Sequence, residues 1–129
     1  MTQNQSSENL RQKVQSDIDA QSLEMCIIIC NECAKVCSST LNYCLRMDEQ
    51  HVEPNHIKTL IACAEICSLN AIWMSRDFEL HTKLCQACAD ISDFCAISCE
   101  KVGDGDRIMN ECADICQRCA QSCLKMVAH

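Results

Sequence analysis

Cysteines recur along this chain at the spacing that returns to one face of an α-helix. Eleven of the fourteen gaps between successive cysteines are 3, 4 or 7 residues, and each of these intervals brings a side chain back to nearly the same side of a helix. The fifteen residues are Cys26, Cys30, Cys33, Cys37, Cys44, Cys63, Cys67, Cys85, Cys88, Cys95, Cys99, Cys112, Cys116, Cys119 and Cys123. They fall in four segments, and the pattern therefore predicts four helices that each present a stripe of thiols.

Residues that form turns are scarce. The 129 residues include only 2 glycines and 1 proline, so the chain favours a single domain built from few, long elements. Pro54 suits the first turn of a helix, and the segment Gly103 to Asp106 is the clearest loop, in which either aspartate can cap the next helix. We expect helices at about 21–47, 54–75, 79–102 and 107–127, with loops at 48–53, 76–78 and 103–106.

The first twenty residues carry a different pattern. Leu10, Val14 and Ile18 repeat every four residues, which predicts a short amphipathic arm helix after a frayed start. We therefore divide the chain into an N-terminal arm, residues 1–20, and a bundle domain, residues 21–129.

Long helices joined by short loops pack antiparallel with their sequence neighbours. The predicted fold class is accordingly all-α, an antiparallel up-down four-helix bundle with a short N-terminal arm helix. Because the cysteine stripes occupy the positions that a bundle buries, we expect a cysteine-lined core.

Two structural roles for so many cysteines are weak alternatives. On a helix the Cβ atoms of residues i and i+4 lie about 5–6 Å apart, whereas a disulfide needs about 3.5–4.5 Å. The odd number of cysteines also argues against a disulfide scaffold. A role as a small apolar core residue suits any single cysteine, but it does not explain fifteen in register.

Metal binding fits the spacing better. Two thiolates on opposite sides of one ion, with bonds of about 2.3 Å as for zinc, place their sulfurs about 4–5 Å apart, which an i, i+4 pair can supply. Soft thiolates select Cu(I), zinc or iron–sulfur clusters, and Cu(I) accepts two ligands. Because a buried array is neutral when ions and thiolates are equal in number, we predict on the order of one Cu(I) per cysteine. The six such pairs are Cys26/Cys30, Cys33/Cys37, Cys63/Cys67, Cys95/Cys99, Cys112/Cys116 and Cys119/Cys123.

Zinc and iron–sulfur clusters are the competing metals. Structural zinc needs closed tetrahedral sets of ligands, each of which would be drawn here from two helices, and this makes zinc less natural than Cu(I). A general thiol buffer or detoxification protein for zinc and other soft metals is the alternative function. Iron–sulfur clusters favour wrapping loops such as the C-x2-C-x2-C-x3-C-P run, and no C-x2-C pair here is followed by a third cysteine at that spacing. Cu(I) storage without catalysis is our main interpretation, since no nucleophile–base arrangement or phosphate-binding loop stands out.

Charge and the N-terminus bear on partners and location. A net charge of −7, with no basic run, argues against nucleic acid as a partner. Residues 1–9 are polar and lack the apolar stretch of a secretory signal, and no run approaches the length needed to span a membrane. We therefore expect a cytoplasmic protein that binds neither nucleic acid nor membrane.

Metal entry is expected at one end of the bundle, where weaker ligands can receive an ion. Continuing the stripes places Met74, His81 and Met126 at the end that contains Cys26 and Cys123, with Met25 angled aside. The inward or near-inward candidates at the far end are Met47, His56 and Met109. We favour the first end as the metal entry, because His81 lies one turn before Cys85 and Met126 lies three residues beyond Cys123.

The repeated C-x3-C pairs on predicted helices, such as Cys26/Cys30 and Cys112/Cys116, resemble those of the bacterial copper storage proteins, specifically the cytosolic type. The resemblance covers about residues 21–126. It implies a homotetramer of four-helix bundles, each filled with multiple Cu(I) ions held mainly by pairs of thiolates, with His and Met residues at the mouth. A copper chaperone or a copper-requiring enzyme is then the expected exchange partner.

The second helix departs from this pattern, because its stripe carries only two cysteines, Cys63 and Cys67, and continues with Asn70 and Met74. We expect a lower capacity near Met74, and we expect Asn70 to hydrogen-bond across the bundle or to face a rotated neighbour. His129, near the C-terminal end, is given no role beyond a weak metal contact.

Overall fold

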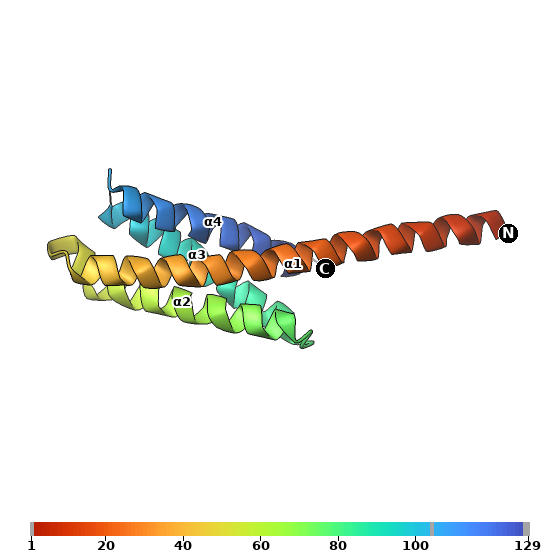
Figure 1. Cartoon of the computed structure of the whole chain (residues 1–129), viewed down its shortest axis with the longest axis horizontal. Helices are drawn as coiled ribbons and strands as arrows, with labels where there is room; N and C mark the ends of the chain where they lie inside the picture. The colour runs from red at the N-terminus through yellow and green to blue at the C-terminus, as the bar shows by residue number, and fades with distance from the viewer. Residues whose placement is uncertain (1, 104, 128–129) are drawn as a thin grey trace.

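The chain folds into a bundle of four helices (Figure 1). The structure is a computed structural model that describes residues 2–103 and 105–127, apart from the side chains of residues 2–4 and 18. Its elements in order are α1 (Thr2–Leu45), the 3-10 helix η1 (Glu49–Val52), α2 (Pro54–Ser75), α3 (His81–Val102) and α4 (Arg107–Val127). Neighbouring helices in the sequence pack against each other, and α1 also packs against α4, which closes the bundle. The predicted fold class, an antiparallel four-helix bundle, is confirmed.

The predicted arm is joined to the first bundle helix rather than separate from it. α1 runs unbroken through residues 20 and 21, because no glycine or proline interrupts the segment and a helix propagates once formed. Figure 1 shows the N-terminal part of α1 projecting beyond the other helices. Leu10 and Val14 are accordingly 63% and 50% exposed, while the side chain of Ile18 lies outside the described residues.

The core consists mainly of sulfur. All fifteen cysteines have an exposed fraction of 0%, which confirms the predicted cysteine-lined interior. Few large side chains share it, chiefly Leu60, Met74 and Met109, and alanines fill the gaps between the helices. A core so poor in hydrocarbon gains less from apolar burial than a leucine core of the same size would.

Acidic side chains fix the start of two helices. The Glu53 carboxylate accepts hydrogen bonds from the backbone N–H groups of Asn55 and His56, both at 3.0 Å, so Glu53 caps α2 ahead of Pro54. Asp106 likewise accepts from the N–H of Ile108 at 3.0 Å. Of the two aspartates expected to cap the fourth helix, Asp106 does so, while Asp104 lies outside the described residues.

α2 corrects one prediction. Within the described part of the chain it is the helix long and apolar enough to cross a membrane, with a mean hydropathy of 1.4 over its most apolar 18-residue window. The expectation that no run reaches this length was therefore wrong. In the bundle 39% of that window is buried, and Cys63, Cys67 and Asn70 point into the core. Length and hydropathy of this kind are shared by core helices of bundles.

Candidate metal centre

Thiols from α1 and α4 meet along most of the bundle, from Cys26/Cys123 to Cys37/Cys112. These two helices run antiparallel, so cysteines that come later in α1 contact cysteines that come earlier in α4. The Sγ–Sγ distances are 3.8 Å for Cys26/Cys123 and Cys30/Cys119, 3.7 Å for Cys30/Cys123, 3.8 Å for Cys33/Cys116, and 3.7 and 4.0 Å from Cys37 to Cys116 and Cys112. All fifteen cysteines are free thiols, so no disulfide competes for these sulfurs.

Cys67 on α2 links the other two helices to this row. Its Sγ lies 3.6 Å from Cys88 on α3 and 3.7 Å from Cys119 on α4. Within single helices, the i, i+4 pairs Cys33/Cys37 and Cys63/Cys67 both lie 4.0 Å apart. Contacts between helices are therefore as close as those within one, and the thiols form a single array.

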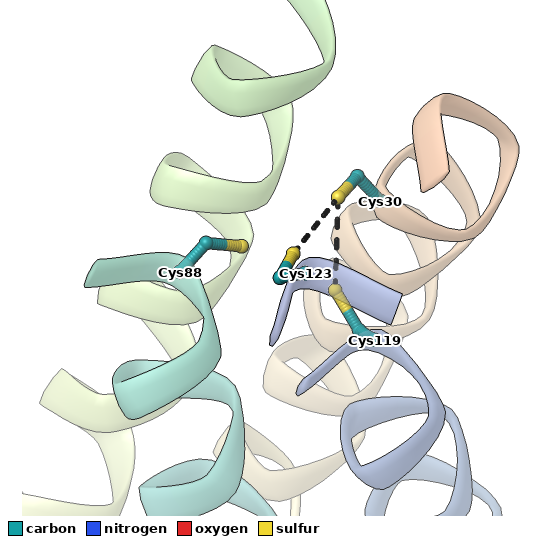
Figure 2. A group of neighbouring side chains, drawn as sticks. All are labelled: Cys30, Cys88, Cys119 and Cys123. Carbon is teal, nitrogen blue, oxygen red and sulfur yellow. Dashed lines mark hydrogen bonds between the residues drawn. The ribbon is translucent and has the colours of Figure 1, made fainter. Parts of the chain in front are cut away.

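Four groups of thiols are compact enough to hold a metal ion, since within each group all Sγ atoms lie within 4.8 Å of one another. Figure 2 shows one of them, in which Cys30, Cys88, Cys119 and Cys123 turn their sulfurs toward a common centre from three helices. The groups overlap, because Cys33, Cys37, Cys116 and Cys119 each belong to two. Their members are Cys30/Cys88/Cys119/Cys123, Cys33/Cys67/Cys119, Cys33/Cys37/Cys63/Cys116 and Cys37/Cys95/Cys112/Cys116.

Polar side chains without sulfur also occupy stripe positions, and Asn70 on α2 is one of them. Asn70 donates to Cys123 at 3.5 Å and to Cys30 at 3.7 Å, and its carbonyl accepts from Cys85 at 3.4 Å. The predicted hydrogen bonding of Asn70 across the bundle is thus confirmed.

Ser92 and Thr40 were missed by sequence reasoning. The Ser92 hydroxyl lies 3.7–3.9 Å from three thiols, those of Cys67, Cys63 and Cys88, and both Ser92 and Thr40 are fully buried. The signal was present in the spacing, since Ser92 follows Cys88 by four residues and Thr40 precedes Cys44 by four. Both positions were overlooked because only cysteines were counted in the stripes.

Burial favours the protonated form of these thiols while no metal is bound, whereas the hydrogen bonds between thiols raise the pKa of some and lower that of others, such as Cys63 and Cys119. Burial raises the pKa of Cys44 to about 11, because the thiolate would lose its hydration. The hydrogen bond with Cys119 is the main cause that raises the pKa of Cys67. A metal ion that enters must therefore displace protons from the thiols that it binds.

One end of the bundle, which we call the His81 end, brings together the three predicted entry residues Met74, His81 and Met126. The Cys85 Sγ lies 3.9 Å from both His81 Nδ1 and Met74 Sδ. Met74 and Met126 are buried, whereas His81 is partly exposed. His81 and Met126 also line a pocket of about 240 Å³ against α1. A partly exposed imidazole therefore connects solvent to a buried thiol at this end.

The opposite end, the His56 end, is closed. The Cys44 Sγ lies 3.5 Å from His56 Nε2 and 3.6 Å from Met109 Sδ, and all three residues are at most 1% exposed. Burial is the main cause that lowers the pKa of His56, so its imidazole is neutral. The inward placement predicted for Met47 was wrong: α1 ends at Leu45, and Met47 is 41% exposed in the following turn.

Tyr43, His51 and Asp106 form a hydrogen-bonded polar cluster at the surface beside the His56 end. Asp106 Oδ2 accepts hydrogen bonds from the Tyr43 hydroxyl at 2.8 Å and from His51 Nε2 at 3.1 Å. Partial burial opposes ionisation of Asp106, but these two hydrogen bonds, together with those from the backbone N–H groups of Met109 and Ile108, lower its pKa overall. Since Tyr43 lies on α1, His51 on η1 and Asp106 at the start of α4, the cluster ties three segments together.

Comparison with known proteins extends these observations. The family model described as copper storage protein matches residues 19–128. A solved structure of a protein from Nitrosospira multiformis is 40% identical, with a TM-score of 0.79 and an alignment covering 84% of this chain and 97% of that one. No match is found among curated proteins.

Two further solved structures are named for the metal they carry. The Cu(I)-bound copper storage protein BsCsp3 of Bacillus subtilis is 34% identical, with a TM-score of 0.76 and coverage of 82% of this chain and 98% of that one. A cytosolic copper storage protein from Streptomyces lividans, with five coppers, is 26% identical, with a TM-score of 0.81 and coverage of 88% and 98%.

Proposed function

The chain belongs to the copper storage protein family, and from this premise we propose that it stores many Cu(I) ions on the thiolates that line its core. The observation that carries the proposal is the overlap of the four buried thiol groups. A cysteine shared between two groups suits a thiolate that bridges two ions, and bridged Cu(I) thiolates can fill the array continuously. All fifteen cysteines are proposed as ligands.

Charge favours Cu(I) over zinc in such an array. One Cu(I) for each thiolate leaves the core neutral, whereas Zn²⁺ bound by four thiolates leaves a charge of −2 at every site. Uncompensated charge in a buried core is costly. Closed zinc sites also need four ligands each, and the sharing of Cys33, Cys37, Cys116 and Cys119 prevents all four groups from closing at once.

Zinc remains the second candidate because of one observation. Three of the groups contain four thiols, and their closest Sγ–Sγ contacts, at 3.7–4.0 Å, are near the separation in a tetrahedral site with bonds of about 2.3 Å. A general thiol buffer would use these groups as closed sites.

A metal competition experiment separates the two functions. The reduced, metal-free protein is loaded to saturation with zinc under anaerobic conditions and then titrated with Cu(I) buffered by a chromophoric chelator. We expect Cu(I) to displace all the zinc and to continue binding beyond the number of zinc ions released. Copper uptake that stops at one ion for each zinc displaced would instead favour the buffer.

The setting of this storage function is proposed from the family and from the surface. We propose a cytoplasmic homotetramer that performs no catalysis and exchanges copper with a chaperone or a copper-requiring enzyme. Exposed apolar side chains on α2 and α3, including Ile61, Leu69, Phe94 and Ile97, offer surface for contacts between copies. The Streptomyces lividans protein is described as cytosolic, which supports the location.

We propose the His81 end as the entry for copper, with Met74, His81 and Met126 as the receiving ligands. His81 is the partly exposed member, and it contacts Cys85 directly. Replacement of His81 by alanine together with Met74 by leucine should slow Cu(I) uptake about tenfold. Loss of the two receiving ligands is expected to raise the activation free energy of uptake by about 1.4 kcal/mol. The final capacity should stay nearly unchanged.

Stopped-flow mixing with a Cu(I)–chelator complex measures this uptake rate. His51→Ala is the matched control, since His51 is a partly exposed histidine that contacts Asp106 at the other end. Equal uptake rates in the wild type and in the double variant would remove the entry role from the His81 end.

A further inference from the structure

Three soft ligand atoms of different kinds meet at the His56 end. Cys44 on α1 contacts both His56 Nε2 on α2, at 3.5 Å, and Met109 Sδ on α4, at 3.6 Å. All three side chains are buried, with exposed fractions of 0%, 1% and 0%. Two ligands on one ion with bonds of about 2.0–2.3 Å lie about 3.5–4 Å apart. The two contacts of Cys44 are therefore already close to the separation that a shared ion requires.

The imidazole of His56 is held in the orientation that such a site needs. Its Nδ1 atom lies 2.7 Å from the Ser98 hydroxyl on α3, and its backbone N–H donates to Glu53. When a metal binds Nε2, the ring proton resides on Nδ1 and is donated to the Ser98 oxygen, which fixes the ring and makes Nε2 a better ligand. A residue from every helix of the bundle thus takes part.

Cys44 stands apart from the thiol array. Its hydrogen bonds run to His56 and Met109 rather than to another cysteine, and it belongs to none of the four compact thiol groups. One turn further inward on α1 and α2, the stripes carry Thr40 and Leu60, which are both fully buried. These two side chains interrupt the run of thiols on that side of the core.

We propose that Cys44, His56 and Met109 form a discrete three-ligand Cu(I) site at the closed end of the bundle, distinct from the thiolate array. The proposal rests on the storage function and adds a site with one thiolate, one imidazole and one thioether. When Cu(I) binds, the Cys44 S–H bond is lost, a sulfur–copper bond forms and the proton leaves to solvent, with no change in oxidation state. The site remains neutral, as burial requires.

The ligand set selects the metal. A thioether is a soft ligand that suits Cu(I), and three protein ligands do not complete the tetrahedron of a closed structural zinc site. The site should therefore bind Cu(I) and Ag(I) and leave Zn²⁺ unbound.

Nuclear magnetic resonance of the full-length protein tests the site independently of total capacity. The protein is labelled with ¹⁵N in histidine and with ¹³C in the methionine methyl groups, and it is titrated anaerobically with Cu(I) and, in a second sample, with Ag(I). We expect the His56 Nε2 and Met109 methyl resonances to shift on saturation. With Ag(I), the Nε2 resonance should split through coupling to the silver nucleus.

Two variants sharpen the test. Cys44→Ser removes the thiolate, and Met109→Leu removes the thioether while keeping a buried side chain of similar size, so each should abolish or weaken the silver coupling at His56. Met47→Leu, which replaces an exposed methionine outside the core, is the matched control and should leave that coupling unchanged. The Met109→Leu variant also assigns the Met109 methyl signal.

The outcomes separate this site from the storage function. Unchanged His56 and Met109 resonances in a protein that binds on the order of one Cu(I) per cysteine would overturn the three-ligand site and leave storage standing. Saturation after only a few ions would overturn storage. Silver coupling at His56 that is undiminished in Cys44→Ser would also overturn the site, because Cys44 is its central ligand.

Discussion

Saturation with Cu(I) should raise the unfolding temperature of this protein by about 20 °C or more. A ligand that binds only the folded state adds about 2.7 kcal/mol of stability at a free concentration 100-fold above its dissociation constant, and many ions contribute here. The metal-free core is made largely of thiols and alanines, so its own stability is expected to be modest. In a chain of this size about 1 kcal/mol shifts the midpoint by a few degrees.

Calorimetry of the reduced protein under anaerobic conditions, with and without saturating Cu(I), measures this shift. A chelator that strips the copper should return the midpoint to the metal-free value, which serves as the control for irreversible change. Binding of copper by the unfolded chain reduces the effect. A rise of only a few degrees would mean that the ions bind outside the folded core.

Replacement of the four cysteines of α4 by serine should remove more than half of the copper capacity. Each of the four compact thiol groups contains at least one of these residues, so the substitution breaks every group at once. The variant carries serine at Cys112, Cys116, Cys119 and Cys123. Serine keeps the size and a polar hydrogen-bonding group, and we expect the bundle to remain helical by circular dichroism.

The matched control removes the same number of thiols from α3. Its cysteines contribute to only two of the four groups, through Cys88 and Cys95, so serine at Cys85, Cys88, Cys95 and Cys99 should cost about four ions by charge balance alone. Bound copper is counted after removal of excess metal by gel filtration. An equal loss in both variants would show that capacity follows the number of thiols rather than their grouping.

The sequence predicted the inside of the bundle well, because helical spacing fixes which side chains share a face. Every cysteine is buried, and the starts of α2 and α4 agree with the positions of Pro54 and Asp106. The same reasoning also explains Asn70, which occupies a stripe position and bonds to thiols of α1, α3 and α4.

Other features depend on information that spacing does not hold. The division into thiol groups requires the relative height and rotation of the helices, which tertiary packing sets. The continuity of α1 across residue 20 was missed because a change of pattern was taken for a change of element. Met47 was misplaced because α1 ends two residues early, and positions at helix ends are the least certain to predict.

The exposed surface also differs from expectation. From the sequence we expected no apolar run of membrane-spanning length, yet α2 is such a helix. Its apolar residues divide between the core and an exposed set that includes Ile61, Leu69 and Ile72. Average hydropathy cannot separate these two sets, whereas the period of the pattern can.

The number of Cu(I) ions bound at saturation tests the storage account most directly. The reduced, metal-free protein is titrated anaerobically with Cu(I) against a competing chromophoric chelator until the chelator begins to retain the metal. The overlapping thiol groups and the neutrality of the core predict a break on the order of one Cu(I) per cysteine. A break at one to four ions would contradict the account, because the buried array would then serve a single structural or buffering site.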